Sequence, residues 1–378
     1  MIIFNLLFAF FSFVYIVLLI QYFYYWKTTK VSVIDAKQRQ LPITVIVPVR
    51  NEEKGIRNCI QSILDQKYSC FQIIVIDDYS EDNTIEIVKG FHAENIFYFS
   101  LKEFYQADRI HTMNKKLAIE LGVQHAKYEL IATIDGDCVA SCLWLSHINT
   151  AFQNQDIQYT TGIVQYNKGD SLLHQFQELD LITLMGITAA SIRMKSAYMS
   201  NGANMSFRKS AFEQIGGYDD IASLPTGDDV FLMHKMIQKY GPTSVLFIKS
   251  LDAAVTTSAC SSINTFFQQR IRWLSKSTSL LSKKVTYILV FMYLYQLIFF
   301  ISFIASFFCD TYQWYLLLMF FLVKISFDLL FLNSVSSYFK KRKLLFGLVY
   351  FEMLYMLYAV IIGILGLRGK YVWKNRSI

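Results

Sequence analysis

Two acidic pairs stand where carboxylates could act on a ligand, and the first is Asp135-Gly136-Asp137, directly after an apolar run over residues 130–134. Carboxylates two residues apart on extended backbone project to the same side, and the glycine between them permits close approach of a ligand. Mg²⁺ and Mn²⁺ prefer such oxygen donors and can bridge a diphosphate. An isolated D-x-D is usually a solvated turn, but its position after a strand favours a divalent metal at Asp135 and Asp137.

The second pair is Asp228-Asp229, which follows Thr226-Gly227 and begins a helical pattern over residues 230–239. Acidic residues in a first helical turn are favoured by capping and by the helix dipole, which is a structural explanation for both. Capping needs only one of the two, so the other remains available for chemistry.

Two further groups of residues suit an anionic ligand. Lys115 and Lys116 begin the helical pattern 114–125, where cations oppose the helix dipole, so a bound diphosphate or simple solvation would explain them. Gln269, Arg272 and Trp273 lie at i, i+3 and i+4 in the expected amphipathic helix 261–282, with Ile263, Phe267, Ile271 and Leu274 along its apolar stripe. They combine an amide, a guanidinium and a stacking ring, although a plain surface helix fits the spacing equally well.

The elements that must position these residues alternate between strand and helix. Apolar runs at 43–49, 73–77, 96–100 and 130–134 are separated by helical patterns at 54–66, 83–91 and 114–125. This order predicts an α/β fold with a doubly wound, mostly parallel sheet, in which ligands bind beyond the carboxyl ends of the strands. The chain has no G-x-G-x-x-G and no G-K-[ST] loop, which disfavours dinucleotide enzymes and P-loop nucleotidases.

The composition indicates a membrane protein. Of the 378 residues, 54% are hydrophobic and only 17% are charged. The six cysteines form no C-x-x-C pair, which argues against a disulfide scaffold and a structural zinc site. The chain has a net charge of +7, and residues 340–378 alone contribute +7, from eight Lys/Arg and one acid. The excess of basic residues therefore lies beside the membrane segments. Nucleic acid is not an expected partner, because the globular domain has no basic stripe.

Four apolar stretches are long enough to cross a bilayer: 1–26, 285–309, 312–339 and 344–367. Lys324 and Asp328 lie at i, i+4 within the third and are expected to form a structural ion pair. The predicted domains are therefore an N-terminal anchor 1–26, a globular domain 40–260, an interface helix 261–284, three C-terminal spans 285–367 and a basic tail 368–378. The positive-inside tendency puts 340–343 in the cytoplasm but conflicts with the tail, so either one segment is re-entrant or the tail breaks the rule.

Together these motifs make the chain similar to family 2 glycosyltransferases, in the membrane-bound branch that contains cellulose synthase, hyaluronan synthase and ceramide glucosyltransferase. The resemblance covers residues 41–276 and depends on seven motifs in the family's order: VPVRNEE (47–53), IDDYSEDNT (76–84), NKKLAIELG (114–122), TIDGDC (133–138), NGANMSFRK (201–209), TGDDVFLMHK (226–235) and QRIRW (269–273). It implies a GT-A fold, a nucleotide-activated sugar donor, Mg²⁺ or Mn²⁺ as cofactor, and inversion at the anomeric carbon.

The resemblance also implies roles for single residues. On the donor side these are Pro48 and Glu52 for the nucleoside, Asp78 for the base, Lys115 or Lys116 for base or phosphate, Asp135 for ribose or metal, and Asp137 for the metal. On the acceptor side Asp229 is the general base beside Asp228, and Gln269, Arg272 and Trp273 serve the diphosphate and the acceptor face. Asn114 and Asp228 depart from the usual Gly and Glu, which affects positioning more than activity.

The function expected from this resemblance is transfer of a sugar, with a UDP-sugar as the favoured donor, to a lipid or membrane-associated glycan. The catalytic domain would face the cytoplasm at a bacterial-type inner membrane. A processive polysaccharide synthase is the alternative, because an oligomer or a partner subunit could complete a channel that three C-terminal spans do not form alone. A non-catalytic scaffold or transporter is more distant.

Overall fold

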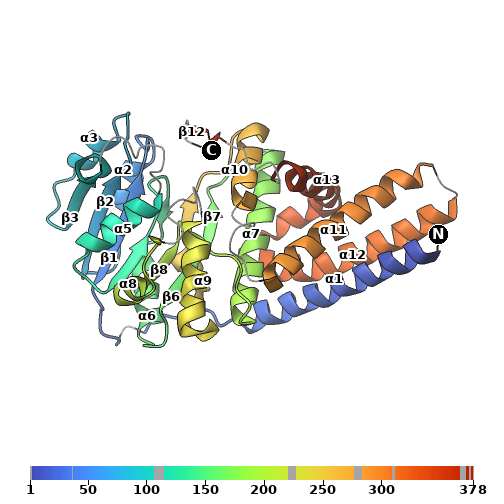
Figure 1. Cartoon of the computed structure of the whole chain (residues 1–378), viewed down its shortest axis with the longest axis horizontal. Helices are drawn as coiled ribbons and strands as arrows, with labels where there is room; N and C mark the ends of the chain where they lie inside the picture. The colour runs from blue at the N-terminus through green and yellow to red at the C-terminus, as the bar shows by residue number, and fades with distance from the viewer. Residues whose placement is uncertain are drawn as a thin grey trace. The chain divides into compact units, whose positions relative to one another are not determined.

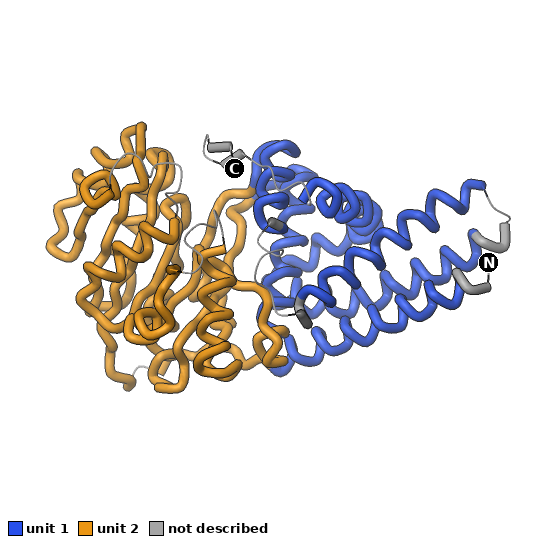
Figure 2. The backbone as a smooth tube through the Cα atoms, in the orientation of Figure 1, with its two compact units in different colours: residues 1–28, 169–190, 260–378 blue, residues 29–168, 191–259 orange. Residues whose placement is uncertain are grey.

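The computed structural model describes residues 2–35, 37–105, 115–219, 227–275, 283–308, 311–366, 372–373 and 376–377. The chain forms two compact units, coloured separately in Figure 2. Unit 1 comprises residues 1–28, 169–190 and 260–378, and unit 2 comprises residues 29–168 and 191–259. The globular domain was expected to be the continuous range 40–260. Residues 169–190 of that range belong instead to unit 1, together with the apolar helices.

Unit 2 is built on a seven-stranded sheet in the order β3-β2-β1-β4-β8-β6-β9 (Figure 1). The first four strands are mutually parallel, β8 is antiparallel to both of its neighbours, and β6 and β9 are parallel. This confirms the mostly parallel α/β sheet. The strands are β1 Ile43–Val49, β2 Phe71–Asp77, β3 Ile96–Ser100, β4 Leu130–Thr133, β6 Tyr159–Gly162, β8 Met205–Arg208 and β9 Val245–Ile248.

The three predicted helices are present, each shorter at one or both ends: α2 is Ile56–Leu64, α3 is Thr84–Lys89 and α5 is Lys115–His125. Helix α5 packs closely on the sheet because it presents Gly122, where an added Cβ would lie 2.7 Å from Ile46. The other helices of this unit are α4 Leu101–Phe104, α6 Trp144–Phe152, α8 Lys209–Gln214 and α9 Asp228–Tyr240, with 3₁₀ turns at Pro242–Ser244 and Leu251–Ala253. A small second sheet joins β5 Val139–Ala140, β10 Val255–Thr257 and β7 Val164–Tyr166.

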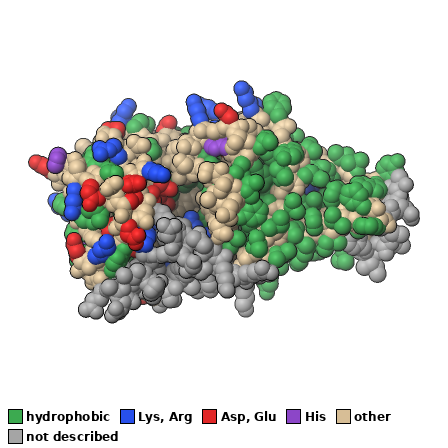
Figure 3. Space-filling model, turned by 90° about the horizontal axis from the view of Figure 1, so that it is seen from above, with side chains coloured by type: hydrophobic (Ala, Val, Ile, Leu, Met, Phe, Trp, Pro, Cys, Tyr) green, Lys and Arg blue, Asp and Glu red, His purple; other side chains and the backbone are tan. Residues whose placement is uncertain are grey.

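Among its described residues, unit 1 contains four helices long and apolar enough to cross a membrane: Asn5–Thr28, Thr286–Ser306, Trp314–Tyr338 and Arg342–Gly366. They confirm the four apolar stretches predicted from the sequence, and Figure 3 shows hydrophobic side chains covering much of the visible surface of this unit. The elements are α1 Ile2–Thr28, α7 Leu172–Arg193, α10 Ile263–Ser275, α11 Lys283–Ser306, α12 Thr311–Tyr338, a 3₁₀ helix Arg342–Gly347 and α13 Leu348–Gly366, with short strands Val372–Trp373 and Arg376–Ser377.

The expected ion pair inside the third apolar stretch is formed. Lys324 Nζ lies 2.7 Å from Asp328 Oδ2, and both side chains are buried. Lys324 also contacts Glu352 of α13, and the hydroxyl of Tyr15 on α1 donates to Asp328 Oδ1 at 2.5 Å. The pair therefore ties three apolar helices together, as polar groups buried between such helices are required to do.

Helix α10 packs its apolar stripe on α13. Ile271 and Ile362 are buried against each other, and the residues packed around them are Phe267, Leu274, Tyr358 and Leu365. The prediction that Ile263 shares this stripe is wrong, because its side chain is 65% exposed. Residues 276–282 of the expected helix lie outside the described residues.

Candidate active site

The loops that follow β1 and β2 hold each other in place. The amide of Asn51 donates to Ser80 Oγ at 3.0 Å, and the amide of Glu52 donates to Thr84 Oγ1 at 2.7 Å. Arg50 donates to the carbonyl of Asp78 at 2.7 Å. Each of these contacts joins a backbone group of one loop to a side chain of the other, so together they form a rim at the carboxyl edge of the sheet, where such sheets bind ligands.

The D-x-D turn after β4 packs directly against this rim. A Cβ added to Gly136 would lie 2.8 Å from Val49 and 3.2 Å from Cγ of Glu52, and one added to Gly55 would lie 2.9 Å from Cα of Asp137. The prediction that Gly136 lets a ligand approach closely is wrong for the space that a side chain at this position would occupy. The space beside Gly136 is filled by protein atoms, so the glycine brings Glu52 next to the acidic pair.

The carboxylates of Asp135 and Asp137 fit a hard divalent cation. With the Cys138 thiol they form a group whose ligand atoms all lie within 4.8 Å of one another. Cys138 Sγ donates to Asp137 Oδ1 at 3.2 Å, and burial raises the pKa of this thiol well above its ordinary value. Mg²⁺ and Mn²⁺ prefer carboxylate oxygen to sulfur, so Asp135 and Asp137 are the donors that would hold either ion.

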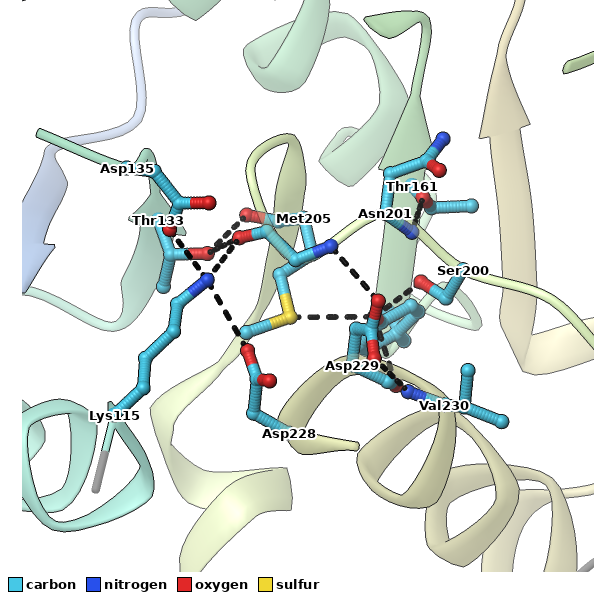
Figure 4. A network of polar contacts seen from close by, with 12 residues as sticks. Lys115, Thr133, Asp135, Thr161, Ser200, Asn201, Met205, Asp228, Asp229 and Val230 are labelled. Atoms are coloured by element: carbon cyan, nitrogen blue, oxygen red, sulfur yellow. Dashed lines mark hydrogen bonds and ion pairs between the residues drawn. The ribbon is translucent and has the colours of Figure 1, made fainter. Parts of the chain in front are cut away.

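Lys115 connects the D-x-D turn to the second acidic pair (Figure 4). Its Nζ lies 2.5 Å from Asp135 Oδ1 and 3.2 Å from Asp228 Oδ2, and it also donates to the carbonyl of Gly202 at 3.2 Å. Burial alone would lower the pKa of Lys115, but the two carboxylates outweigh it and raise the pKa above its ordinary value. Lys115 is therefore not simply a solvated surface lysine, because its ammonium is paired with two acids of the site.

Asp229 is held differently from Asp228. Its Oδ2 accepts the amide of Gly202 at 3.0 Å and its Oδ1 accepts the amide of Val230 at 2.8 Å (Figure 4). Both acids lie in the first turn of α9, after Gly227 with a left-handed φ of 89°. Asp229 therefore accepts one amide of its own helix and one of the loop at Gly202, and Asp228 faces the ammonium of Lys115.

Gly202 was not singled out by the sequence analysis as a site residue, although it lies in the quoted motif NGANMSFRK. A Cβ at this position would be 2.8 Å from Asp228 Oδ2 and 3.0 Å from Lys115 Nζ. Only glycine therefore lets this backbone approach both residues. The available signal was a glycine inside a polar loop directly before a strand.

The remaining predicted residues fall into three places. Pro48 lies within β1, and the amide of Asp78 donates to the carbonyl of Val49 at 2.8 Å, so both lie at the rim. Lys116 is 1% exposed with its Nζ 5.8 Å from the centre of the Phe231 ring, so the expectation of a solvated lysine is wrong. Gln269, Arg272 and Trp273 lie on α10 of unit 1, and their role toward a diphosphate or an acceptor stays a prediction.

Comparison with known families identifies the domain. Residues 44–216 match the sequence profile described as Glycosyl transferase family 2, and this range includes the D-x-D turn, Lys115 and Gly202. The chain carries a family 2 glycosyltransferase domain. The match ends before Asp228 and Asp229 and before α10.

Curated relatives of this domain are polysaccharide synthases. The chain is 26% identical over 179 residues to poly-beta-1,6-N-acetyl-D-glucosamine synthase of Staphylococcus epidermidis, and 25% identical over the same length to that of Staphylococcus aureus. Each match covers 47% of this chain and 42% of the relative, so it spans less than half of either protein.

A solved structure shares the fold over nearly the whole chain. A mannosyltransferase from Pyrobaculum calidifontis, in complex with GDP-Man and Mn²⁺, superposes with a TM-score of 0.62 at 14% identity. The alignment covers 97% of each chain. This likeness confirms the GT-A fold. GDP-Man is bound to the mannosyltransferase, and the likeness assigns no donor to the present chain.

Proposed function

We propose that this protein is a membrane-held, inverting glycosyltransferase that moves a sugar from a nucleotide-sugar donor to an acceptor hydroxyl. The observation that carries the proposal is the single ammonium of Lys115 between Asp135 and Asp228. It joins the predicted donor side of the site to the predicted acceptor side inside one partly buried polar network. The family 2 match over residues 44–216 supports the reaction class.

On the donor side, Asp135 and Asp137 would hold Mg²⁺ or Mn²⁺, which would neutralise the diphosphate of the donor as it leaves. Lys115 adds a fixed positive charge beside Asp135. A preorganised charge of this kind stabilises a developing anion without reorganising in the transition state. The Mn²⁺ present with the Pyrobaculum mannosyltransferase supports a divalent metal in this fold.

On the acceptor side, Asp229 would be the general base. Its carboxylate takes the proton of the acceptor hydroxyl while that oxygen attacks the anomeric carbon and the bond to the diphosphate breaks on the opposite face. Each Asp229 oxygen already accepts one amide, and a carboxylate oxygen has a second lone pair to receive a proton. The two amides fix its direction, and Asp228 is engaged with Lys115.

The membrane context narrows the acceptor. Four apolar helices favour a lipid or a membrane-associated glycan as acceptor, and they favour a position in a cytoplasmic membrane with the domain in the cytoplasm, where nucleotide sugars occur. Among donors, a UDP-sugar remains the favoured one. The decisive experiment is a donor screen with detergent-purified protein that reads release of free nucleoside diphosphate. Absence of release from UDP- and GDP-sugars in the presence of Mn²⁺ or Mg²⁺ would refute the proposal.

A processive polysaccharide synthase is the second candidate, and the two staphylococcal relatives favour it. The two candidates differ in product length. With radiolabelled donor and membrane fractions, single transfer gives a lipid-extractable product of one size, whereas a processive enzyme gives a polymer that is retained in gel filtration. UDP-N-acetylglucosamine is the first donor to test, because the relatives are named for a polymer of N-acetylglucosamine.

A further inference from the structure

Trp273 is stacked against Arg270, the residue at the second position of QRIRW, for which the sequence analysis assigned no role. The guanidinium carbon of Arg270 lies 4.1 Å from the centre of the Trp273 ring and 4.9 Å from the centre of the Phe266 ring. Its side chain is only 2% exposed. A planar guanidinium this close to an indole face makes a directional cation–π contact and restricts the ring.

Arg270 is itself fixed by α7. Its NH2 lies 2.9 Å from Asp180 Oδ2, and the Asp180 side chain is 8% exposed. Three residues earlier on α7, the Gln177 side chain makes two hydrogen bonds to the backbone of Cys260, both 2.9 Å long. Helix α7 therefore anchors the start and the middle of the segment that carries Trp273. All these residues belong to unit 1.

The neighbouring stripe of α10, one residue further along the helix, is anchored on α13. Ile271 and Leu274 pack against α13, and a Cβ added to Gly366 would lie 2.4 Å from Leu274. Because α10 is fixed by this apolar contact, loss of Arg270 would release the indole ring without releasing the helix. This separation makes a role in ring positioning testable apart from folding.

We propose that Arg270, fixed by Asp180, is a positioning residue that sets the orientation of Trp273 as an acceptor-binding surface. The inference depends on the proposed function, in which Trp273 serves the acceptor. A ring with one face stacked on a guanidinium can offer only its other face and its edges to a sugar. Arg270 thereby determines which side of Trp273 receives the acceptor, and it contacts neither donor nor acceptor in this role.

The test compares Arg270→Lys with Trp273→Ala and with the matched control Lys341→Gln. Arg270→Lys keeps the charge for Asp180 but loses the planar stacking. Lys341 forms another ion pair to α7, 2.6 Å from Glu178, and its removal leaves Trp273 untouched. With membrane fractions and radiolabelled UDP-N-acetylglucosamine as the probe, Arg270→Lys should lower transfer about 3- to 30-fold, the range of one cation–π contact. Donor hydrolysis in detergent should stay unchanged.

A second readout follows the ring itself. In protein labelled with 5-fluorotryptophan, Trp273→Phe identifies the fluorine resonance of Trp273. Arg270→Lys should shift or split that resonance, Asp180→Asn should do so less, and Lys341→Gln should leave it in place. An unchanged resonance in Arg270→Lys overturns the inference, as does wild-type transfer by Arg270→Lys when Trp273→Ala is impaired. Normal transfer by Trp273→Ala instead overturns the acceptor role and with it the proposed function of this helix.

Discussion

The ammonium of Lys115 lies 2.5 Å from the Asp135 carboxylate and 3.2 Å from that of Asp228, so one cation serves two acids from different elements. Asp135 follows β4, Asp228 begins α9, and Lys115 begins α5. Without this cation, two carboxylates would lie near each other with no positive charge between them, Asp228 largely buried and Asp135 with a side chain 37% exposed. The lysine is therefore required both for the electrostatics of the site and for its geometry.

Replacing Lys115 should distinguish these requirements. Lys115→Met should reduce donor turnover by about 10²-fold or more, the scale of losing a major electrostatic stabiliser, and should also lower the melting temperature. Lys115→Arg keeps the charge and should retain the melting temperature with a smaller loss of rate. Nucleoside diphosphate release and thermal unfolding of the same preparations measure both effects. Wild-type turnover by Lys115→Met would contradict this account.

Metal dependence should follow from Asp135 and Asp137. Chelation with EDTA should abolish donor turnover, and added Mn²⁺ or Mg²⁺ should restore it. Asp137→Ala should lose about two orders of magnitude in rate and require more metal for half-maximal activity. Asp156→Asn, at an exposed acid away from this turn, is the control and should titrate like the wild type. Full activity in excess EDTA would refute the metal assignment.

Substitutions of the two acids of α9 should have different effects, one on the rate of transfer and the other on donor binding. Asp229→Asn keeps the shape but removes the base, so single-turnover transfer should fall about 10²- to 10⁴-fold while donor binding by calorimetry barely changes. Asp228→Asn breaks the contact with Lys115 and should weaken donor binding. If Asp229→Asn transfers normally and Asp228→Asn is inactive, the base is Asp228. Loss of donor binding in both would assign the pair to structure or metal.

Gly202 should tolerate no side chain. In Gly202→Ala the new Cβ would lie 2.8 Å from Asp228 Oδ2, so the acid or Lys115 must move. We expect about a tenfold or larger loss of turnover, as small displacements of a catalytic group commonly cause. Gly90→Ala, at a helix end with its nearest contact at 3.3 Å, serves as the control and should keep its activity. Equal activity of both variants would contradict the close approach at Gly202.

Much of the α/β unit could be predicted from the sequence, because its signals are local. Continuous apolar runs such as Ile43–Val49 are typical of strands buried on both faces, and the polar turns after them mark the binding edge. The antiparallel β8 was not predicted as a strand. Its four residues Met205–Arg208 do alternate between apolar and polar, but a run this short inside a polar loop motif is a weak strand signal.

Tertiary contacts account for what the sequence could not supply. The pairing of Lys115 with Asp135 and Asp228 joins residues 20 and 113 positions away, which no spacing rule relates. Helix α7 was predicted to be part of the globular domain because the residues before and after it in the sequence belong to that domain. Residues 169–190 nevertheless belong to unit 1. The periodicity of α10 likewise aligns Ile263 with Phe267 and Ile271, but Ile263 is 65% exposed and is not among the residues packed with α13.

Stability of unit 2 should fall in mild acid because of His147. The ring accepts or donates to Ser32 Oγ at 2.9 Å and Ser250 Oγ at 3.0 Å, and burial lowers its pKa against the opposing effect of Asp252. A lowered pKa means that unfolding takes up a proton, so stability is full above about pH 6.5 and decreases as the pH falls below it.

Thermal unfolding at pH 8 and pH 5 measures this effect. The wild type should lose more stability between the two values than His147→Asn, which cannot be protonated. His92→Gln removes an exposed histidine instead and should behave like the wild type. An identical pH dependence in His147→Asn and wild type would assign the acid sensitivity to other groups.

The assignment of α7 to the apolar unit has a consequence for synthesis and expression. During synthesis, Asp180 is made 90 residues before its partner Arg270, and Glu178 is made 163 residues before its partner Lys341. Both acids are therefore unpaired until those later segments have been synthesised. The Phe176 ring likewise meets Phe351 only when the last apolar helix has been made. Nascent α7 therefore needs the bilayer surface or a chaperone in the interval. A fragment of residues 29–259 would still carry this helix without its partners, and replacing residues 169–190 in that fragment by a short hydrophilic linker would leave unit 2 alone.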